Sequence, residues 1–176
     1  MTILYTILIG LAALIVLILA LALVLKKSYQ ITCETTINAP LPDVFNYVKQ
    51  LKNQDYFNKW VMADPNMQRN FKGTDGTVGF IYAWNGNNQA GEGELEITQL
   101  IDNQSVHTEI RFVRPFKSVG YTQMHTEAIN PTTTKVIWSN QGEMKYPLNI
   151  LLPMVTKMLG KDMQTSLGNL NAILTH

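Results

Sequence analysis

The chain has 176 residues, with 14 basic and 13 acidic side chains and a formal net charge of +1. That balance argues against nucleic acid as the main partner, because phosphate binding needs a concentrated basic face. The lone Cys33 excludes an intramolecular disulfide, and no Cys or His cluster has the spacing of a zinc site. We therefore expect no metal and no cofactor.

The N-terminal segment is predicted to be a membrane anchor. From Ile3 to Leu25 the chain is apolar, interrupted only by Thr6 and Gly10. About 23 helical residues span about 34 Å, which exceeds the ~30 Å of a hydrocarbon core. The alternative is a secretory signal peptide, but the segment lacks a positive n-region, a short apolar region and a small-residue cleavage site. We expect a single-pass transmembrane helix at residues 3–25 that lies in the lipid bilayer.

The residues after this run set the topology. Lys26 and Lys27 follow it directly, and the positive-inside tendency places that side in the cytoplasm. Period-two alternation starts at Tyr29, so almost no linker separates helix from domain. We predict a transmembrane anchor over 1–27 and one soluble domain over 28–176, held at the cell membrane with the soluble part cytoplasmic.

The soluble part begins as a strand and continues as two short helical stretches. The strand ends at Asn38–Pro42, and Pro42 suits the first turn of a helix that runs to Val48. A second short helical or irregular stretch holds Phe57 and Trp60. Turn residues then separate a series of predicted strands: Met67–Lys72, Thr77–Trp84, Gly91–Ile101, Ser105–Val113, Lys117–Ile129 and Thr133–Lys145.

The connections between these strands are short, which predicts an antiparallel meander. Residues 148–175 then show apolar side chains at spacings of three and four, as in one long helix. Pro153 fits only the first turn of a helix, so the regular part is expected to begin near Leu152. The element order predicts an α+β domain.

Several segments recur in an order and spacing that agree with these elements: Ile37–Pro40, Val44–Val48, Trp60, Tyr82–Asn87 with Gly91–Ile97, Arg111–Phe116, Leu159–Met163 and Leu167–Leu170. Together they resemble the START-like superfamily, also called SRPBCC or polyketide cyclase/dehydrase and lipid-transport proteins. The resemblance implies a helix-grip fold, in which a curved antiparallel sheet wraps the long C-terminal helix and leaves a cavity. Such families bind lipids, quinones, hormones or polyketides, and some are enzymes, so the fold fixes no chemistry.

Large apolar side chains on the strands and the last helix are the candidates for the cavity lining. They are Phe80, Tyr82, Trp84, Phe112, Met124, Trp138, Leu159 and Met163. The alternative is that they simply fill a core. Gly160 and Gly168 lie near one face of the long helix, where small residues leave room either for a ligand or for a close strand.

Carboxylates on one strand form a second candidate site. Glu92, Glu94 and Glu96 alternate with apolar positions, so they share a face. A desolvated pair of carboxylates could divide acid and base roles. The alternative is a solvated outer face, on which these groups pair with Arg111 or His107 of the next strand.

A third candidate is the pair His125 and Glu127, which could act as a general base in a pocket. The alternative is an exposed histidine on a sheet. No GxSxG, Walker A, GxGxxG or HExxH motif accompanies the pair. The catalytic residues are therefore left unassigned, and the sequence favours a protein that is not an enzyme.

The hydrophobic segment Tyr146–Met154 opens the last helix. If its side chains are exposed, the segment could cover the cavity or touch the bilayer. If it packs on the sheet, it is part of the core. The leading hypothesis is a membrane-anchored domain that binds an apolar small molecule, such as a lipid, an isoprenoid or a polyketide-like compound. A cyclase or hydrolase with His125 or a buried glutamate as base, and a ligand-free interaction domain, are the alternatives.

Overall fold

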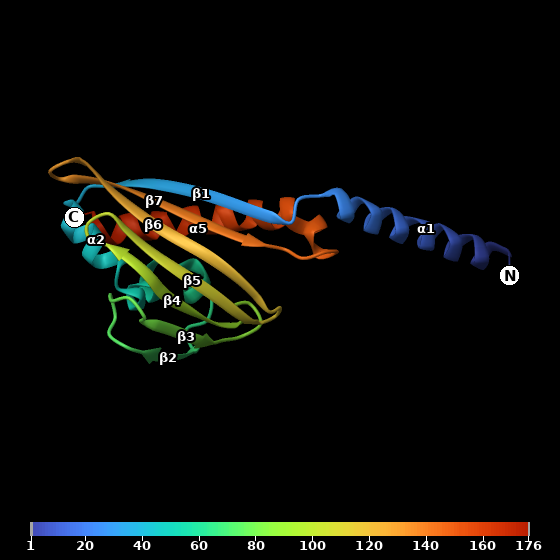
Figure 1. The fold of residues 1–176 in the computed structure, drawn as a ribbon, viewed down its shortest axis with the longest axis horizontal. Helices are drawn as coiled ribbons and strands as arrows, with labels where there is room; N and C mark the ends of the chain where they lie inside the picture. The colour runs from blue at the N-terminus through green and yellow to red at the C-terminus, as the bar shows by residue number, and fades with distance from the viewer. Residues whose placement is uncertain (1, 176) are drawn as a thin grey trace.

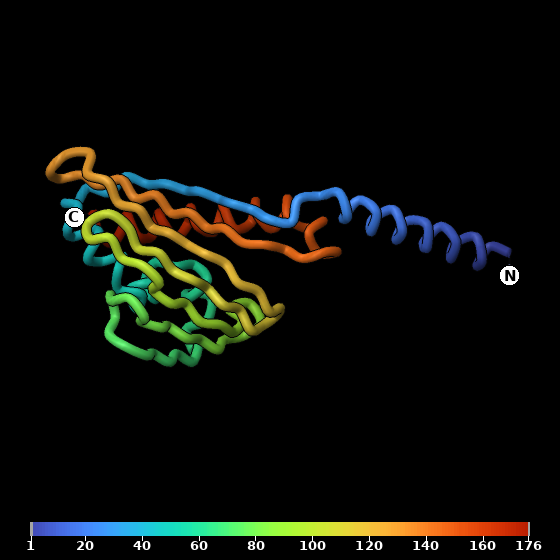
Figure 2. Tube along the Cα trace, viewed as in Figure 1, coloured from blue at the N-terminus to red at the C-terminus, as the bar shows by residue number. Residues whose placement is uncertain are grey.

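The computed structural model describes residues 2–175 and shows a domain of sheet and helices with one further helix projecting from it (Figure 1). That helix, α1 (Thr2–Val24), is exposed along its length except at Leu19, which is half-buried, and Ala22, which is buried. It is the one helix among residues 2–175 that is long and apolar enough to cross a membrane, a test that a signal sequence also passes. Figure 2 shows the short connection from α1 into the first strand.

The soluble domain is built on a single antiparallel sheet with the order β1-β7-β6-β5-β4-β3-β2. Each strand after β1 pairs with the next one along the chain, and β1 closes against the last one. This is the predicted meander. The strands are β1 (Ser28–Ile37), β2 (Gln68–Lys72), β3 (Ile81–Asn85), β4 (Glu92–Ile101), β5 (Ser105–Arg114), β6 (Ser118–Asn130) and β7 (Thr133–Glu143).

Helices cover the inner face of this sheet. The long α5 lies along it, and Figure 1 shows it side by side with β1. It begins at Leu152 with a proline in its first turn, as the sequence predicts. The helical elements are α2 (Leu41–Val48), η1 (Leu51–Asn53), α3 (Gln54–Phe57), α4 (Lys59–Met62), η2 (Leu148–Leu151) and α5 (Leu152–Leu174).

One strand is shorter than its sequence pattern indicates. A strand was expected over Thr77–Trp84, but β3 begins only at Ile81. Gly76 and Gly79 have φ angles of 75° and 86°, in the left-handed region that interrupts an extended strand. The apolar residues before β3 therefore lie in a turn.

The main core lies under the C-terminal half of α5. Met163, Leu167 and Leu170 are fully buried there. They pack against the inward side chains of β6 and β7 and against α2, in one cluster that includes Val136 and Trp138. Burying each such side chain contributes about 1.5–3 kcal/mol of transfer free energy, so this cluster holds helix and sheet together.

A buried side chain joins the domain to α1. Asn149 of η2 is fully buried, and its Nδ2 donates to the carbonyl oxygens of Ala22 at 2.7 Å and Leu25 at 3.2 Å. These carbonyls belong to the end of α1, where the last turn leaves acceptors without intrahelical partners. The amide of Asn149 satisfies them and fixes η2 against the end of α1.

Candidate ligand cavity

A cavity of about 380 Å³ lies between the inner face of the sheet and the first turns of α5. Its size falls in the range of small-molecule sites. The sheet and the short helices supply most of the wall, and α5 closes the other side. The main lining residues are Trp60, Tyr82, Trp84, Leu95, Ile110 and Phe112, with Val155, Met158 and Leu159 from α5.

The lining of this cavity contains no Asp, Glu, Lys or Arg among the residues that the structure describes. Its polar members are neutral amides and hydroxyls. A charged ligand group would lose its hydration there without an opposite charge to compensate, which is costly. The cavity is therefore suited to apolar, uncharged molecules.

The hydroxyl of Tyr82 faces this cavity but is already engaged. It donates to Asp55 Oδ1 at 2.5 Å and accepts from Arg69 Nε at 3.0 Å. Burial, followed by the bond to Asp55, raises the pKa of Tyr82 well above its ordinary value, against a smaller opposing effect of Arg69. The phenol therefore stays neutral and serves to join β3, β2 and α3.

Two inward side chains of β7 are different, because they carry polar atoms without partners. Trp138 Nε1 and Asn140 Oδ1 are buried and have no hydrogen-bond partner within residues 2–175. They lie two positions apart on the same face of the strand. Trp138 belongs to the core cluster, whereas Asn140 lines the cavity.

The cavity opens at the end of the domain from which α1 leaves. Phe116 in the β5–β6 turn is 67% exposed and Met158 on α5 is 53% exposed, and both are lining residues. Figure 1 places that turn and the start of α5 at this end. More large apolar side chains are exposed close by in the chain: Tyr146, Leu148, Leu151 and Met154. The segment Tyr146–Met154 thus has both exposed members and buried ones such as Leu152.

The structure divides the eight predicted lining residues into two sets. Those around the cavity are Tyr82, Trp84, Phe112 and Leu159. Those outside its lining are Phe80, in a smaller core cluster with Leu51 and Ile97, and Met124, Trp138 and Met163 in the main core.

Sequence reasoning missed Asn140. The signal was present, because Val136, Trp138 and Asn140 alternate on one face of a predicted strand, which makes Asn140 a polar residue at an inward position. The exposed rim residues Phe116 and Met158 could not be found in this way, since the β5–β6 turn and the exposure of α5 depend on the tertiary structure.

The two helix glycines do not line the cavity. A Cβ on Gly160 would lie 3.6 Å from Ile31 Cγ2, and the carbonyl of Gly160 accepts from Cys33 Sγ at 3.4 Å. Gly160 therefore faces β1, but a Cβ there would make an ordinary van der Waals contact, so the packing of α5 on β1 does not require a glycine. Gly168 is exposed, with open space around it.

The strand carboxylates lie on the outer face, as the surface alternative predicts. Arg111 donates to Glu94 at 2.5 Å and to Glu96 and Glu109 at 2.7 Å. Hydrogen bonds to these three carboxylates raise the pKa of Arg111. His107 is opposite Gln99 and has Ser105 Oγ at 3.0 Å from its Nε2.

His125 and Glu127 also point away from the cavity. Met124 and Thr126, on either side of His125, are buried, so the alternate positions of His125 and Glu127 face outward. A base at His125 would therefore act on the opposite side of the sheet from the cavity. Within residues 2–175, no group of three or more His, Cys, Asp or Glu side chains could hold a metal ion.

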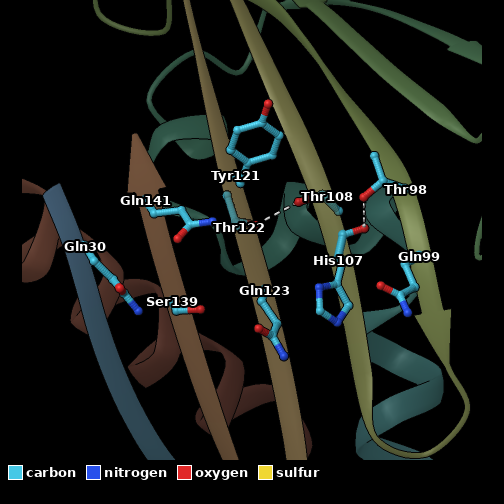
Figure 3. Close-up of a pocket in the computed structure, with 10 residues that line it drawn as sticks. All are labelled: Gln30, Thr98, Gln99, His107, Thr108, Tyr121, Thr122, Gln123, Ser139 and Gln141. Carbon is cyan, nitrogen blue, oxygen red and sulfur yellow. Dashed lines mark hydrogen bonds between the residues drawn. The ribbon is translucent and has the colours of Figure 1, made fainter. Parts of the chain in front are cut away.

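A second hollow, of about 220 Å³, lies on the outer face of the sheet (Figure 3). Its lining is polar, and the side chains of Gln30, Gln123, Gln141 and His107 come from four different strands. The Thr108–Thr122 hydroxyl bond of 2.8 Å also joins β5 and β6, but both residues share the inward parity of Val106 and Met124, so it lies on the inner face. The polar surface of the outer hollow can hydrogen-bond water, but it offers little apolar area to a ligand.

Comparison with solved structures supports this architecture. A norcoclaurine synthase from Thalictrum flavum matches with a TM-score of 0.64 and 13% identity, over 85% of this chain and 95% of that one. A protein from Chromobacterium violaceum matches at 0.60 and 12%, over 84% and 97%, and Ara h 8.0201 at 0.53 and 14%, over 81% and 98%. The domain has the helix-grip fold.

This is the fold that the START-like resemblance implies, and at these identities the likeness concerns the fold alone. No protein-family model matches the sequence, and no curated protein matches it significantly. The chemistry of the helix-grip domain must therefore be argued from its own residues.

Proposed function

We propose that this protein is a membrane-anchored helix-grip domain that takes up an apolar small molecule from the adjacent bilayer. The observation that carries the proposal is an uncharged cavity of about 380 Å³ with exposed lining residues in the β5–β6 turn and the first turns of α5. Figure 1 places both segments at the end of the domain from which α1 leaves. In this proposal α1 spans the cell membrane, with the domain on its cytoplasmic side, as Lys26 and Lys27 favour.

The connection between α1 and the domain supports this arrangement. Asn149 fixes η2 to the last turn of α1, so the mouth is held within a short distance of the membrane surface. The exposed side chains of Leu148, Leu151 and Met154 lie on the same segment and suit a lipid interface. Tethering also raises the effective concentration of the domain at the bilayer.

Other helix-grip structures agree with a binding role. A structure of the Thalictrum flavum norcoclaurine synthase holds dopamine and hydroxybenzaldehyde. In the present protein, the cavity has no charged lining group within residues 2–175. His125 lies on the opposite face of the sheet from the cavity. We therefore propose binding or transfer in preference to catalysis.

The test is native mass spectrometry of the full chain in mild detergent, equilibrated with 1-dodecanol and dodecane. We expect one bound molecule per chain in the wild type and a weaker adduct in Leu159→Trp, because the larger indole would occupy part of the cavity. Lys157→Trp is the matched control, since Lys157 is exposed on the same helix. Absence of any adduct in the wild type, or equal adducts in both variants, would overturn the proposal.

A further inference from the structure

The inner face of β7 places an unpaired amide in the wall of the cavity. Asn140 is 9% exposed, lines the cavity, and leaves its Oδ1 buried without a hydrogen-bond partner within residues 2–175. Leaving a buried acceptor without a hydrogen bond is costly, because the group has lost its water and gained no partner. A leucine here would avoid that cost, so the amide needs another explanation.

A second polar group lies close to this amide. Tyr29 of β1 is opposite Gly142 of β7, and Gly142 is two positions from Asn140 on the same face. A Cβ on Gly142 would lie 2.9 Å from Tyr29 Oη, so the phenol is folded over the glycine. Tyr29 lines the same cavity, and burial raises the pKa of its hydroxyl, which keeps it neutral.

We infer that Asn140, with Tyr29 beside it, binds the polar head of a neutral amphiphile, such as a long-chain or isoprenoid alcohol, whose apolar body fills the rest of the cavity. This inference rests on the proposed function and specifies its ligand class. A ligand hydroxyl can both donate and accept a hydrogen bond. By rotating, the Asn140 amide can present either its acceptor oxygen or its donor NH₂, so either group can pair with that hydroxyl.

The surroundings exclude an ionised head group. Among the described residues the cavity lining carries no charge, so a carboxylate or phosphate at Asn140 would be desolvated without a counter-ion. The apolar body has a complementary surface in Trp84, Leu95 and Phe112 on the neighbouring strands. The site therefore distinguishes ligands by one neutral hydrogen bond.

The experiment uses the full chain in mild detergent with an equimolar mixture of 1-dodecanol, dodecane and dodecanoate, and native mass spectrometry counts each adduct. We expect the wild type to prefer the alcohol over the alkane by about three- to tenfold, the value of one net hydrogen bond. Asn140→Leu should abolish that preference while still binding alkane, and Tyr29→Phe should reduce it. Gln141→Leu, on the exposed outer face of the same strand, should leave it unchanged.

A second readout separates a ligand role from a structural one. If the amide is unpaired in the free protein, Asn140→Leu raises the melting temperature measured by tryptophan fluorescence without added probe. A lower melting temperature would mean that Asn140 stabilises the fold, and would overturn the inference.

The outcomes also separate the inference from the proposed function. Equal binding of alcohol and alkane, unchanged by Asn140→Leu, overturns the polar-head site and leaves apolar binding in place. Dodecanoate as the preferred adduct overturns the neutral ligand class. Absence of every adduct overturns both proposals.

Discussion

The C-terminal half of α5 and its N-terminal half lie along the same sheet but are covered differently. Around Met163 and Leu167 the helix is sealed by β6, β7 and α2, and these side chains are fully buried. Val155 and Leu159 instead line the cavity, so this part of the helix borders an open space and not a closed core. One helix therefore contributes to the closed core with about half of its length and to the cavity wall with the other half.

The sharpest test of this division compares one truncation in each half. Leu167→Ala should lower the free energy of unfolding by about 2–5 kcal/mol, because it leaves a void in a closed core. Met158→Ala, at the exposed rim, should cost well under about 1 kcal/mol. Urea unfolding followed by tryptophan fluorescence measures both. Similar losses at the two positions would mean that the cavity end is packed as tightly as the core.

The cavity wall is also expected to respond to high pH. The raised pKa of Tyr82 means that the folded protein keeps a proton that the unfolded chain loses above its ordinary pKa of 10.0. The free energy of unfolding should therefore stay level below about pH 10. Above it the free energy should fall, by at most about 1.4 kcal/mol per pH unit for this group.

Urea unfolding between about pH 8 and about pH 11 measures this slope, and Tyr82→Phe is the control. The slope should be shallower in Tyr82→Phe, because the phenylalanine has no proton to lose. Tyr29 and Tyr47 retain their own contributions, since burial raises both of their pKa values. Identical slopes in the two proteins would contradict the assignment to Tyr82.

The smallest expected effect concerns the outer face. Arg111→Met removes the cation that three carboxylates share, but these side chains are partly exposed and screened by water. We expect a loss of about 0.5–1 kcal/mol that shrinks at high salt, with unchanged adducts in native mass spectrometry. A change in ligand binding would show that the outer network shapes the cavity.

Much of the fold could be read from the sequence because it depends on local patterns. Alternation predicted the strands, turn residues predicted the meander, and Pro153 marked the start of α5. The failure at Thr77–Trp84 has a local cause as well, since Gly76 and Gly79 adopt left-handed conformations that hydrophobic alternation does not report. The cavity was harder to predict. Alternation indicates which side chains point toward the inside of the sheet, but not whether another element packs against them.

The sequence by itself determined an apolar helix long enough to span a membrane, an α+β domain of antiparallel strands, and the parity of each strand. These follow from hydropathy, turn chemistry and the twofold period of a strand. Only the tertiary structure decided that Tyr82 and Phe112 border a cavity while Met124 and Met163 are core. The physical reason is that packing depends on the distance between helix and sheet, which contacts between residues far apart in the chain establish.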